Sequence, residues 1–313
     1  MTETVHTPVM LAETMELLRV APGGRYCDAT VGGAGHAHEI LERSAPDGAL
    51  LAIDRDPEAL IRSRARLARF GDRATFCRGN YADVAAIIAR LGLPPVDGLL
   101  VDLGVSSHQL EDAARGFSFA ADGPLDMRMD PDAPITAAEL MARLSEHELS
   151  GVIRELGEEP AARKIARAMK RALARGELRS TADLARLVSG AVGGRSPGRR
   201  RIHPATRTFQ ALRMMVNEEL PSLQRFLDSF VDVLRPGGRV AVIAFHSLED
   251  RAVKQALRRL ANPCTCPPGL PVCACGRRRV VLEVTHRPLR PRPEELAVNA
   301  RARSARLRAA ERA

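Results

Sequence analysis

The sequence predicts an α/β protein built on a mostly parallel sheet that is interrupted by an inserted helical domain. Up to residue 103, short apolar runs alternate with segments of helical periodicity, which is typical of successive β-α units. From about residue 116 this alternation gives way to Arg-rich helical patterns, and it resumes after residue 205. We therefore expect one discontinuous domain over 1–115 and 206–313, with the helical insert over 116–205.

The expected strands are the short apolar runs themselves. Before the insert these runs cover 25–30, 49–54, 74–78 and 96–103. After the insert the pattern predicts a long helix over 205–234, a turn at Arg-Pro-Gly-Gly, a strand over 239–245 and a final strand near 280–285. No internal repeat is visible.

Composition points to a cytoplasmic protein. A chain of 313 residues is long enough for two structural units with a buried core. The first twenty residues lack the pattern of a secretory signal, and no uncharged apolar run reaches the roughly 18 residues that a membrane span needs. Cys27 and Cys77 stand alone in apolar segments, which suits a reducing compartment. We expect no membrane association.

Positive charge is concentrated in two segments. The formal net charge is +9 and the sequence pI is near 9.9, a balance that favours a polyanionic partner. Residues 151–205 carry 13 Lys and Arg against 5 acids, and residues 277–313 carry 11 Arg against 4 Glu. Solvated helix faces and a solubilising tail would give the same pattern as two RNA-binding surfaces. Because tryptophan is absent and aromatics make up 3%, any RNA would be held mainly through its phosphates.

Unusual residues follow the first two expected strands, at the sheet edge where open α/β folds bind ligands. The turn Asp-Ala-Thr-Val-Gly-Gly-Ala-Gly-His begins at Asp28, and its small residues let backbone amides approach a ligand. Asp54 ends the second strand, where a carboxylate can accept hydrogen bonds from both hydroxyls of a ribose. Together they indicate a site for a nucleoside-type cofactor, although a tight turn with a helix-capping Asp would look similar.

Details of the turn favour S-adenosylmethionine over a dinucleotide. The pattern G-x-G-x-x-G, counted from Gly33 and Gly35, has His38 at its third position, which disfavours pyrophosphate binding. A nicotinamide-dependent oxidoreductase is therefore the weaker alternative. A loose glycine turn, an acid such as Asp28 near an amino-acid tail and the ribose acid Asp54 suit S-adenosylmethionine. Tyr81, just beyond the third strand, could lie against an adenine ring or simply pack in the core.

Asp102 at the end of the fourth strand is the catalytic candidate. In methyl transfer the protein mainly aligns donor and acceptor. If the acceptor is an exocyclic amine, whose lone pair is delocalised into the ring, a carboxylate that accepts its N–H bonds would help to free that lone pair. A structural Asp that binds the glycine turn is the alternative interpretation.

Eight segments, in this order along nearly the whole chain, closely resemble the bacterial RsmH (MraW) family: DATVGGAGH, LLAIDRDP, LLVDLGVSS, RGFSFAADGPLDMRMDP, GEEPAARKIARAM, HPATRTFQALRMMVN, FHSLEDRAVK and NARARSARLRAAER. The resemblance implies a Rossmann-like class I methyltransferase sheet interrupted by a helical substrate-recognition domain. It also implies transfer of the methyl group of S-adenosylmethionine to N4 of a cytidine, cytosine 1402, in the decoding region of 16S rRNA. The expected partner is this RNA, within the small ribosomal subunit or its late assembly intermediate.

The family's cofactor contacts, carried onto this sequence, fall on Ala34, Gly35, His36, Asp54, Tyr81, Asp102 and Gln109. Three positions depart from the family's pattern. Ala34 stands where Gly is common, Tyr81 where Phe occurs, and His108 where Pro often precedes the Gln. The methyl group of Ala34 should be tolerated unless this residue needs a positive φ, in which case cofactor affinity would suffer. His108 is interpreted as a surface residue rather than a general base.

Residues on the RNA side are assigned less fully. Arg207 and Arg213, which flank Phe209 and Gln210, could present cations and a polar group towards the cleft, whereas a core position is the alternative for Phe209. His246 and Ser247 follow the fifth strand, near the expected acceptor base. A non-catalytic RNA-binding or assembly factor would also need the basic surfaces, but not the cofactor site.

Four cysteines cluster near the end of the chain, at positions 264, 266, 273 and 275. They could supply four thiolates to a structural zinc. Their spacing is tighter than the usual C-x2–4-C, so the sequence alone favours free thiols in a surface loop. We assign no metal from the sequence.

Overall fold

The computed structural model describes residues 8–193, 203–266 and 274–313, and the chain divides into two compact units. The first unit comprises Met1–Gly104 and Leu220–Ala313, and the second comprises Val105–Glu219. The sequence placed these boundaries near 116 and 205. The helix α10 (Thr206–Val216) joins the second unit because it packs on α7 (Glu146–Gly157), where a Cβ on Gly157 would lie 2.6 Å from the carbonyl oxygen of Arg207.

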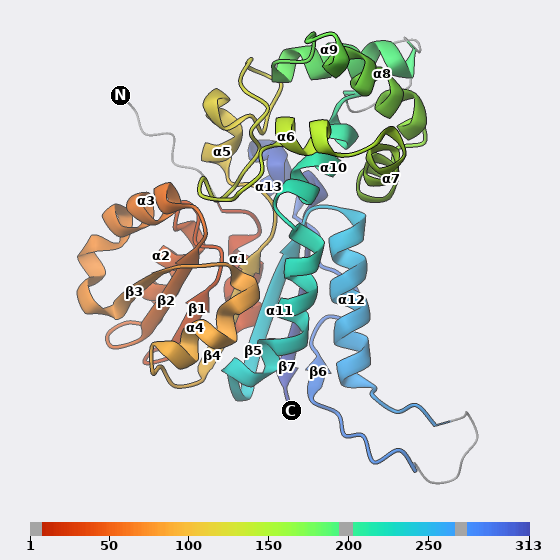
Figure 1. Ribbon diagram of the computed structural model, residues 1–313. Coiled ribbons are helices and arrows are strands. Elements are labelled where there is room, and N and C mark those ends of the chain that lie inside the picture. Colours follow the sequence, from red (N-terminus) through yellow and green to blue (C-terminus); the bar gives the residue numbers. More distant parts are fainter. Residues whose placement is uncertain (1–7, 194–202, 267–273) are drawn as a thin grey trace. The chain divides into compact units, whose positions relative to one another are not determined.

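A seven-stranded sheet forms the centre of the first unit (Figure 1). Its strands are β1 (Arg25–Asp28), β2 (Ala49–Asp54), β3 (Ala74–Arg78), β4 (Val96–Asp102), β5 (Leu234–Ala244), β6 (Val281–Glu283) and β7 (Arg306–Arg312). They lie in the order β3-β2-β1-β4-β5-β7-β6. The first five are parallel, and β7 runs antiparallel to both β5 and β6. The prediction of a Rossmann-like α/β sheet is confirmed.

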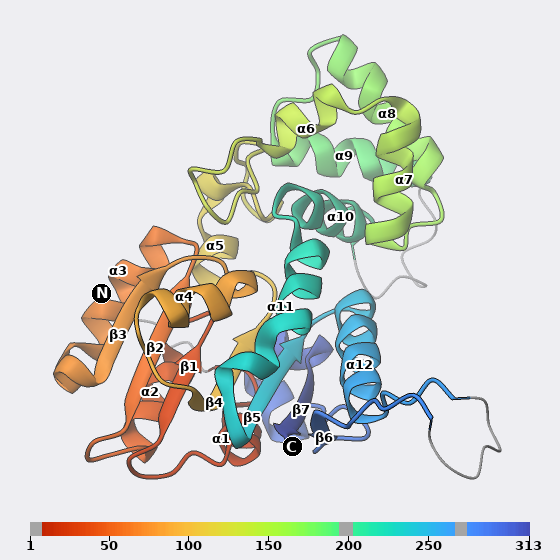
Figure 2. The same cartoon turned by 60° about the horizontal axis from the view of Figure 1, so that its bottom comes forward.

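Helices cover both faces of this sheet (Figures 1 and 2). One face packs on α1 (Leu11–Leu18), α2 (Gly35–Arg43) and α3 (Pro57–Leu67), and the other packs on α4 (Val84–Arg90), α11 (Glu219–Val233) and α12 (Ser247–Ala261). Alternate residues of one strand serve the two cores: Leu50 faces the first group of helices, and Leu51 faces the second. Because the middle of the sheet is covered on both faces, β2 and β4 are mostly apolar runs, which helped to recognise these strands in the sequence.

The end of the chain was predicted only in part: the strand expected near 280–285 is present as β6, but it is not the last strand. The sequence assigned the last strand to residues near 280–285, and the basic segment beyond it to a surface or tail. Instead, β7 pairs with β5 from Arg239↔Glu311 to Ala244↔Arg306, in the interior of the sheet. A short helix α13 (Pro293–Val298) and the 3-10 helix η4 (Ala300–Ser304) precede it. Arg308 on this strand is only 4% exposed and binds the carboxylate of Asp250 at 2.6 Å.

Two further expectations around the insert need correction. The long helix over 205–234 is two helices, α10 and α11, because Asn217 ends α10 and Glu218 takes a left-handed conformation with φ 48°. The expected Arg-Pro-Gly-Gly turn lies inside β5, where the register against β4 shifts between Val96 and Gly98. The sequence also predicts a turn at GGRSPGRRR, residues 193–201, of which 194–201 lie outside the described residues.

The second unit is helical and has its own core. It contains α5 (Ser107–Glu111), α6 (Ala137–Arg143), α7, α8 (Ala162–Ala174), α9 (Thr181–Val192), α10 and the 3-10 helix η3 (Ala113–Arg115). Capping boxes at Thr136, Ser145 and Ser180 begin α6, α7 and α9. Among the described residues of both units, no helix combines the length and the apolar composition that crossing a bilayer requires.

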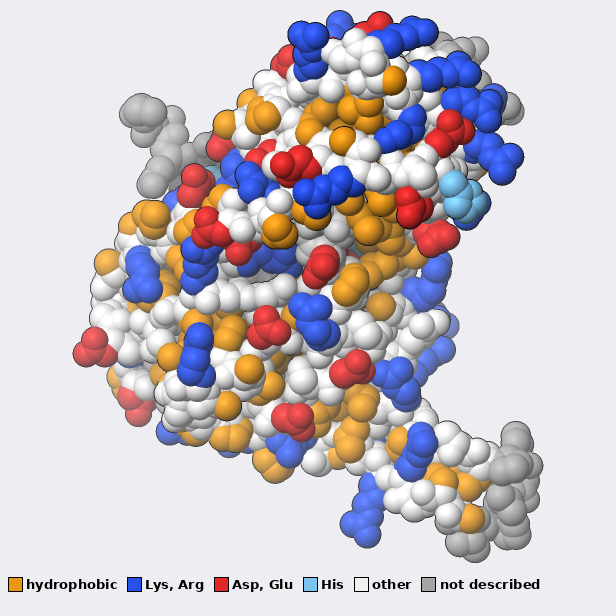
Figure 3. Space-filling model, in the orientation of Figure 1, with side chains coloured by type: hydrophobic (Ala, Val, Ile, Leu, Met, Phe, Trp, Pro, Cys, Tyr) orange, Lys and Arg blue, Asp and Glu red, His pale blue; other side chains and the backbone are white. Residues whose placement is uncertain are grey.

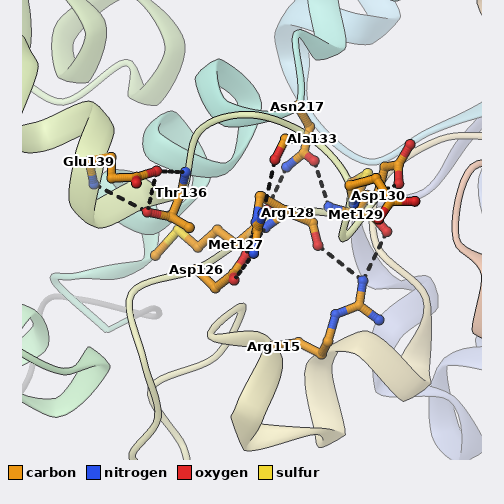
Figure 4. Close-up of polar contacts among 11 residues, drawn as sticks. Arg115, Asp126, Met127, Arg128, Met129, Asp130, Ala133, Thr136, Glu139 and Asn217 are labelled. Atoms are coloured by element: carbon orange, nitrogen blue, oxygen red, sulfur yellow. Dashed lines mark hydrogen bonds and ion pairs between the residues drawn. The ribbon is translucent and has the colours of Figure 1, made fainter.

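The irregular segment between α5 and α6 is held by buried hydrogen bonds (Figure 4). The side chain of Asn217 donates to the carbonyl oxygen of Met127 and accepts from the backbone N–H of Met129, each at 2.7 Å. The guanidinium of Arg115 donates to the carbonyl oxygens of Arg128 and Met129 at 3.0 and 2.9 Å. These bonds satisfy backbone groups that form no strand or helix, so this loop is fixed within the second unit.

Candidate active site

Three carboxylates end three adjacent strands of the first unit. Asp28 ends β1, Asp54 ends β2 and Asp102 ends β4. Because β2, β1 and β4 are neighbours and parallel, their carboxyl ends lie along one edge of the sheet. Burial is the largest cause of the raised pKa values of Asp28 and Asp102. The charge of Asp54 adds to the shift of Asp28, and the charge of Asp28 adds to that of Asp102, so the three groups form one electrostatic cluster.

The glycine turn after β1 is tied to this edge by its backbone. The N–H of Ala29 donates to the carbonyl oxygen of Leu100, and the N–H of Val31 donates to that of Ile53, both at 2.9 Å. The N–H of Gly32 donates to Oδ2 of Asp54, also at 2.9 Å. The turn is thus fixed against β2 and β4 before any ligand binds.

Ala34 and Gly35 lead from this turn into α2, and each has a tight conformational requirement. Ala34 is fully buried and takes a left-handed conformation with φ 59° and ψ 28°. This is the positive φ at which we expected the methyl group of Ala34 to be unfavourable. This conformation costs a residue with a Cβ about 1–2 kcal/mol. At Gly35 a Cβ would come within 2.2 Å of Cγ of Pro8, so only glycine fits without movement.

Asp54 organises the turn and is half-buried. Its Oδ1 accepts from the N–H of Asp56, and its Oδ2 accepts from that of Gly32. The cap of α3 is Asp56, not Asp54, which argues against a pure capping role for Asp54. A carboxylate has about four lone-pair positions, so two remain for hydroxyl donors such as those of a ribose. Burial raises the pKa of Asp54, while the two N–H donors lower it in part.

Asp102 carries a buried oxygen without a partner. Its backbone N–H donates to Oγ1 of Thr30 at 2.7 Å, but its Oδ1 is buried and makes no hydrogen bond. Burial raises the pKa of Asp102 well above its usual range, and the charges of Asp28 and Glu249 add to this. Since Asp54 rather than Asp102 binds the turn, Asp102 keeps its acceptor oxygen available for a ligand.

His36 lies beside Asp102 and is neutral. Its Nε2 donates to the carbonyl oxygen of Val9 at 2.9 Å, because that oxygen can only accept. Burial lowers the pKa of His36 to about 4, although the hydrogen bond to Val9 opposes the change. The unprotonated Nδ1 therefore faces Oδ2 of Asp102 at 3.8 Å. His36 thus brings no positive charge to the carboxylates.

The site as a whole is built to attract a cation. Burial raises the pKa of Asp28 to about 7, although the N–H of Thr30 lowers it in part. Buried carboxylates that repel one another are stabilised when a positive charge lies between them. A ligand with a sulfonium or ammonium group and hydroxyl donors suits this edge of the sheet.

Two of the expected cofactor contacts have internal partners. Tyr81 is 8% exposed, and its ring packs edge-on against Phe226 with the centroids 5.8 Å apart. Gln109 lies in the second unit, where it forms the capping box of α5: its N–H donates to Oγ of Ser106, and its Oε1 accepts from the N–H of Ser106. Their roles toward a cofactor stay predictions.

The residues expected to face RNA at the start of α10 also make internal contacts. Arg213 forms a bidentate ion pair with Glu219 at 2.7 and 2.8 Å, and Phe209 is buried in the second unit's core. The side chains of Arg207 and Gln210 donate to carbonyl oxygens of the segment after α7 and of α7 itself. These contacts favour the structural interpretation for Phe209 and Arg213.

Sequence reasoning missed two contributors to the site. Thr30 within the turn fixes the backbone of Asp102, as described above, and no sequence motif marked this role. Glu249, at the beginning of α12, accepts from the N–H of Phe245 at 2.9 Å and lies 3.1 Å from Nε2 of His246. Its effect on the pKa of Asp102 brings the end of β5 into the same electrostatic site.

The strand order with an antiparallel β7 between β5 and β6 is that of the Rossmann-like class I methyltransferases, and the carboxylates lie at the carboxyl ends of the parallel strands, where open α/β sheets bind ligands. Comparisons with known proteins agree on the class. The profile of the MraW methylase family matches residues 3–313, and the chain belongs to this family.

Curated relatives match over nearly their whole length. The Ribosomal RNA small subunit methyltransferase H of Symbiobacterium thermophilum is 53% identical over 304 residues, covering 97% of this chain and 95% of that protein. The protein of the same name from Geobacter sulfurreducens is 53% identical over 307 residues, covering 98% of each. Among solved structures, an rRNA methylase from Streptococcus thermophilus aligns over 99% of both chains with 12% identity and a TM-score of 0.42.

Proposed function

We propose that this protein transfers the methyl group of S-adenosylmethionine to N4 of a cytidine, cytosine 1402, in the 16S RNA of the small ribosomal subunit. The observation that carries the proposal is the cluster of Asp28, Asp54 and Asp102 around a rigid glycine turn. The names of the curated relatives support small-subunit ribosomal RNA as the substrate. The resemblance noted in the sequence supports N4 of the cytidine.

The residues present fit this cofactor. Asp54 retains lone pairs for two ribose hydroxyls, and the turn from Gly32 to Gly35 brings backbone close to a ligand. Asp28 and Asp102 supply negative charge for a cationic group. When bound, S-adenosylmethionine supplies an electrophilic methyl group on a positively charged sulfur.

Asp102 is the residue proposed to act on the acceptor. The lone pair of an exocyclic amine is delocalised into its ring, so the amine is a poor nucleophile. The unpartnered Oδ1 of Asp102 would accept an N–H bond from this amine and draw the lone pair back onto nitrogen. Alignment of donor and acceptor at about 3–3.5 Å would supply most of the remaining rate enhancement.

The helix α8 provides a surface for RNA phosphates. One face is buried through Ile165, Ala166 and Met169, and the opposite face exposes Arg163, Lys164, Arg167 and Arg171. Figure 3 shows Lys and Arg side chains gathered over α8 and α9. Such contacts position RNA without reading its sequence. The other basic segment, 277–313, offers less positive charge for RNA than its composition suggested, because Arg306 and Arg308 pair with Asp250.

The test is transfer of a labelled methyl group from S-adenosylmethionine to purified 30S particles and to free 16S RNA, followed by nucleoside analysis. We expect the label in N4-methylcytidine. Label found only in another modified nucleoside would refute the proposed position while preserving the cofactor. Absence of binding heat with S-adenosylmethionine, in protein shown to be folded by circular dichroism, would refute the cofactor itself.

A further inference from the structure

Two described limbs, 262–266 and 274–280, follow α12 and precede β6. Figure 1 shows these limbs leaving the ends of α12 and β6 side by side. In both limbs no residue is buried and none belongs to a helix or strand. Apolar burial therefore does not explain how the two described limbs are held.

Three cysteines meet across these two limbs. Cys264 and Cys266 lie on the first limb and Cys275 on the second, and their three Sγ atoms lie within 4.8 Å of one another. The Sγ atoms of Cys264 and Cys275 are 3.9 Å apart. Two sulfurs in a disulfide would be about 2.05 Å apart, so Cys264 and Cys275 form no disulfide with each other.

We propose that Cys264, Cys266 and Cys275 bind a structural Zn²⁺ that cross-links the two limbs. Zinc binds thiolates at about 2.3 Å in a tetrahedron, which places neighbouring sulfurs about 3.8 Å apart. The separation of 3.9 Å between Cys264 and Cys275 matches that tetrahedral edge. Cys273, which the sequence also offers as a thiolate, lies outside the described residues, and the proposal rests on the other three.

A backbone hydrogen bond orients one of the three sulfurs. The N–H of Ala274 donates to Sγ of Cys266 at 3.3 Å, from the opposite limb. Outer hydrogen bonds of this kind orient metal ligands. Arg277, Arg278 and Arg279 follow directly and are exposed, so they add positive charge that offsets the charge of the thiolates. The cluster belongs to the first unit and is independent of the proposed methyl transfer.

The first experiment measures metal content. The full chain is purified without chelator and without a metal-binding tag, and zinc is quantified by mass spectrometry. We expect one zinc per chain in the wild type and in Thr265→Ser, a matched substitution between two of the ligands, and loss of this zinc in Cys264→Ser and Cys275→Ser. Zinc retained at one per chain in both cysteine variants would overturn the proposal.

A second experiment remains informative if those variants fold poorly. Metal-stripped, reduced wild-type chain is titrated with Co²⁺, whose visible absorption reports tetrahedral thiolate coordination. Trypsin cleavage after Arg277 and Arg278 is then followed with zinc and with chelator. We expect cleavage there to slow by about tenfold or more with zinc. No cobalt–thiolate absorption, or a Cys264–Cys275 disulfide in freshly prepared reduced protein, would overturn the proposal.

Discussion

The substitution Asp28→Asn separates the stability of the first unit from its affinity for a cation. Asp28 is 1% exposed, and burial raises its pKa from 3.8 to about 7. Between these two values the folded protein binds a proton that the unfolded chain releases. The free energy of unfolding therefore falls as pH rises through this window. Asparagine has the same shape, and its Oδ1 can still accept the N–H of Thr30, but it cannot ionise.

The magnitude follows from the pKa difference. Roughly three pH units at about 1.36 kcal/mol each correspond to about 4 kcal/mol above pH 7. A buried amide NH₂ group that finds no acceptor costs about 1–3 kcal/mol. We therefore expect Asp28→Asn to exceed the wild type by roughly 2 kcal/mol at pH 8 without cofactor. This advantage should shrink as the pH falls from 8 towards 4 and should reverse below about pH 4, because the wild-type carboxyl is then largely protonated in both states and only the cost of the amide remains.

The assay is urea denaturation followed by circular dichroism at pH 5, 6, 7 and 8, combined with calorimetric titration of S-adenosylmethionine. The variant should bind this cation at least about tenfold more weakly, a loss of about 1.4 kcal/mol. Asp72→Asn, the same substitution at an exposed site of the first unit, should change stability by less than about 0.5 kcal/mol. An Asp28→Asn protein less stable than wild type at pH 8, with an unchanged pH slope, would refute the reasoning.

Three further substitutions test other parts of the structure. Asp102→Ala should lower the methyl-transfer rate by about 10²–10³-fold at saturating cofactor, and an unchanged rate would remove its proposed role. Arg308→Met should cost about 3 kcal/mol, because it leaves Asp250 buried with a weaker partner. Burial raises the pKa of Asp250, but the hydrogen bond and charge of Arg308 more than offset burial and hold this pKa below its usual value. The stability advantage of the wild type should therefore vanish as the pH falls below about 4. A difference in stability that does not depend on pH would contradict this assignment. Asn217→Ala should destabilise the second unit by about 3 kcal/mol by stranding the N–H of Met129 and the carbonyl oxygen of Met127; a loss below about 1 kcal/mol would contradict the assignment.

The first four strands could be predicted because their apolar residues pack on both sides of the sheet and so form short apolar runs in the sequence. The observed β2 and β3 have the bounds that were predicted for them. The carboxylates could be predicted for a related reason: a polar residue that ends such a run must lie at the sheet edge. The left-handed backbone of Ala34 and the bond from Asp102 to Thr30 leave no such pattern, because each depends on three-dimensional contacts.

The strand β7 shows where sequence reasoning fails. Its residues, Arg-Leu-Arg-Ala-Ala-Glu-Arg, favour a helix or a solvated tail by composition. They form an interior strand because β5 and β6 offer hydrogen-bonding edges and because Asp250, on α12, neutralises Arg308. Tertiary contacts here outweigh local preference, and only the resemblance to a family indicated that this segment mattered.

The same carboxylates explain why the cofactor edge is both a structural weakness and a binding site. Asp28 is buried and Asp102 is half-buried at the same edge of the sheet, and the neutral state of His36 leaves their repulsion unrelieved. Each proton that they retain lowers this repulsion but also removes negative charge that would attract a sulfonium. A positively charged ligand supplies the missing counter-charge and lowers both pKa values again. The repulsion that lowers the free energy of unfolding at this edge is therefore relieved when a cationic ligand binds. A ligand without the positive sulfur relieves less of this repulsion and should bind more weakly.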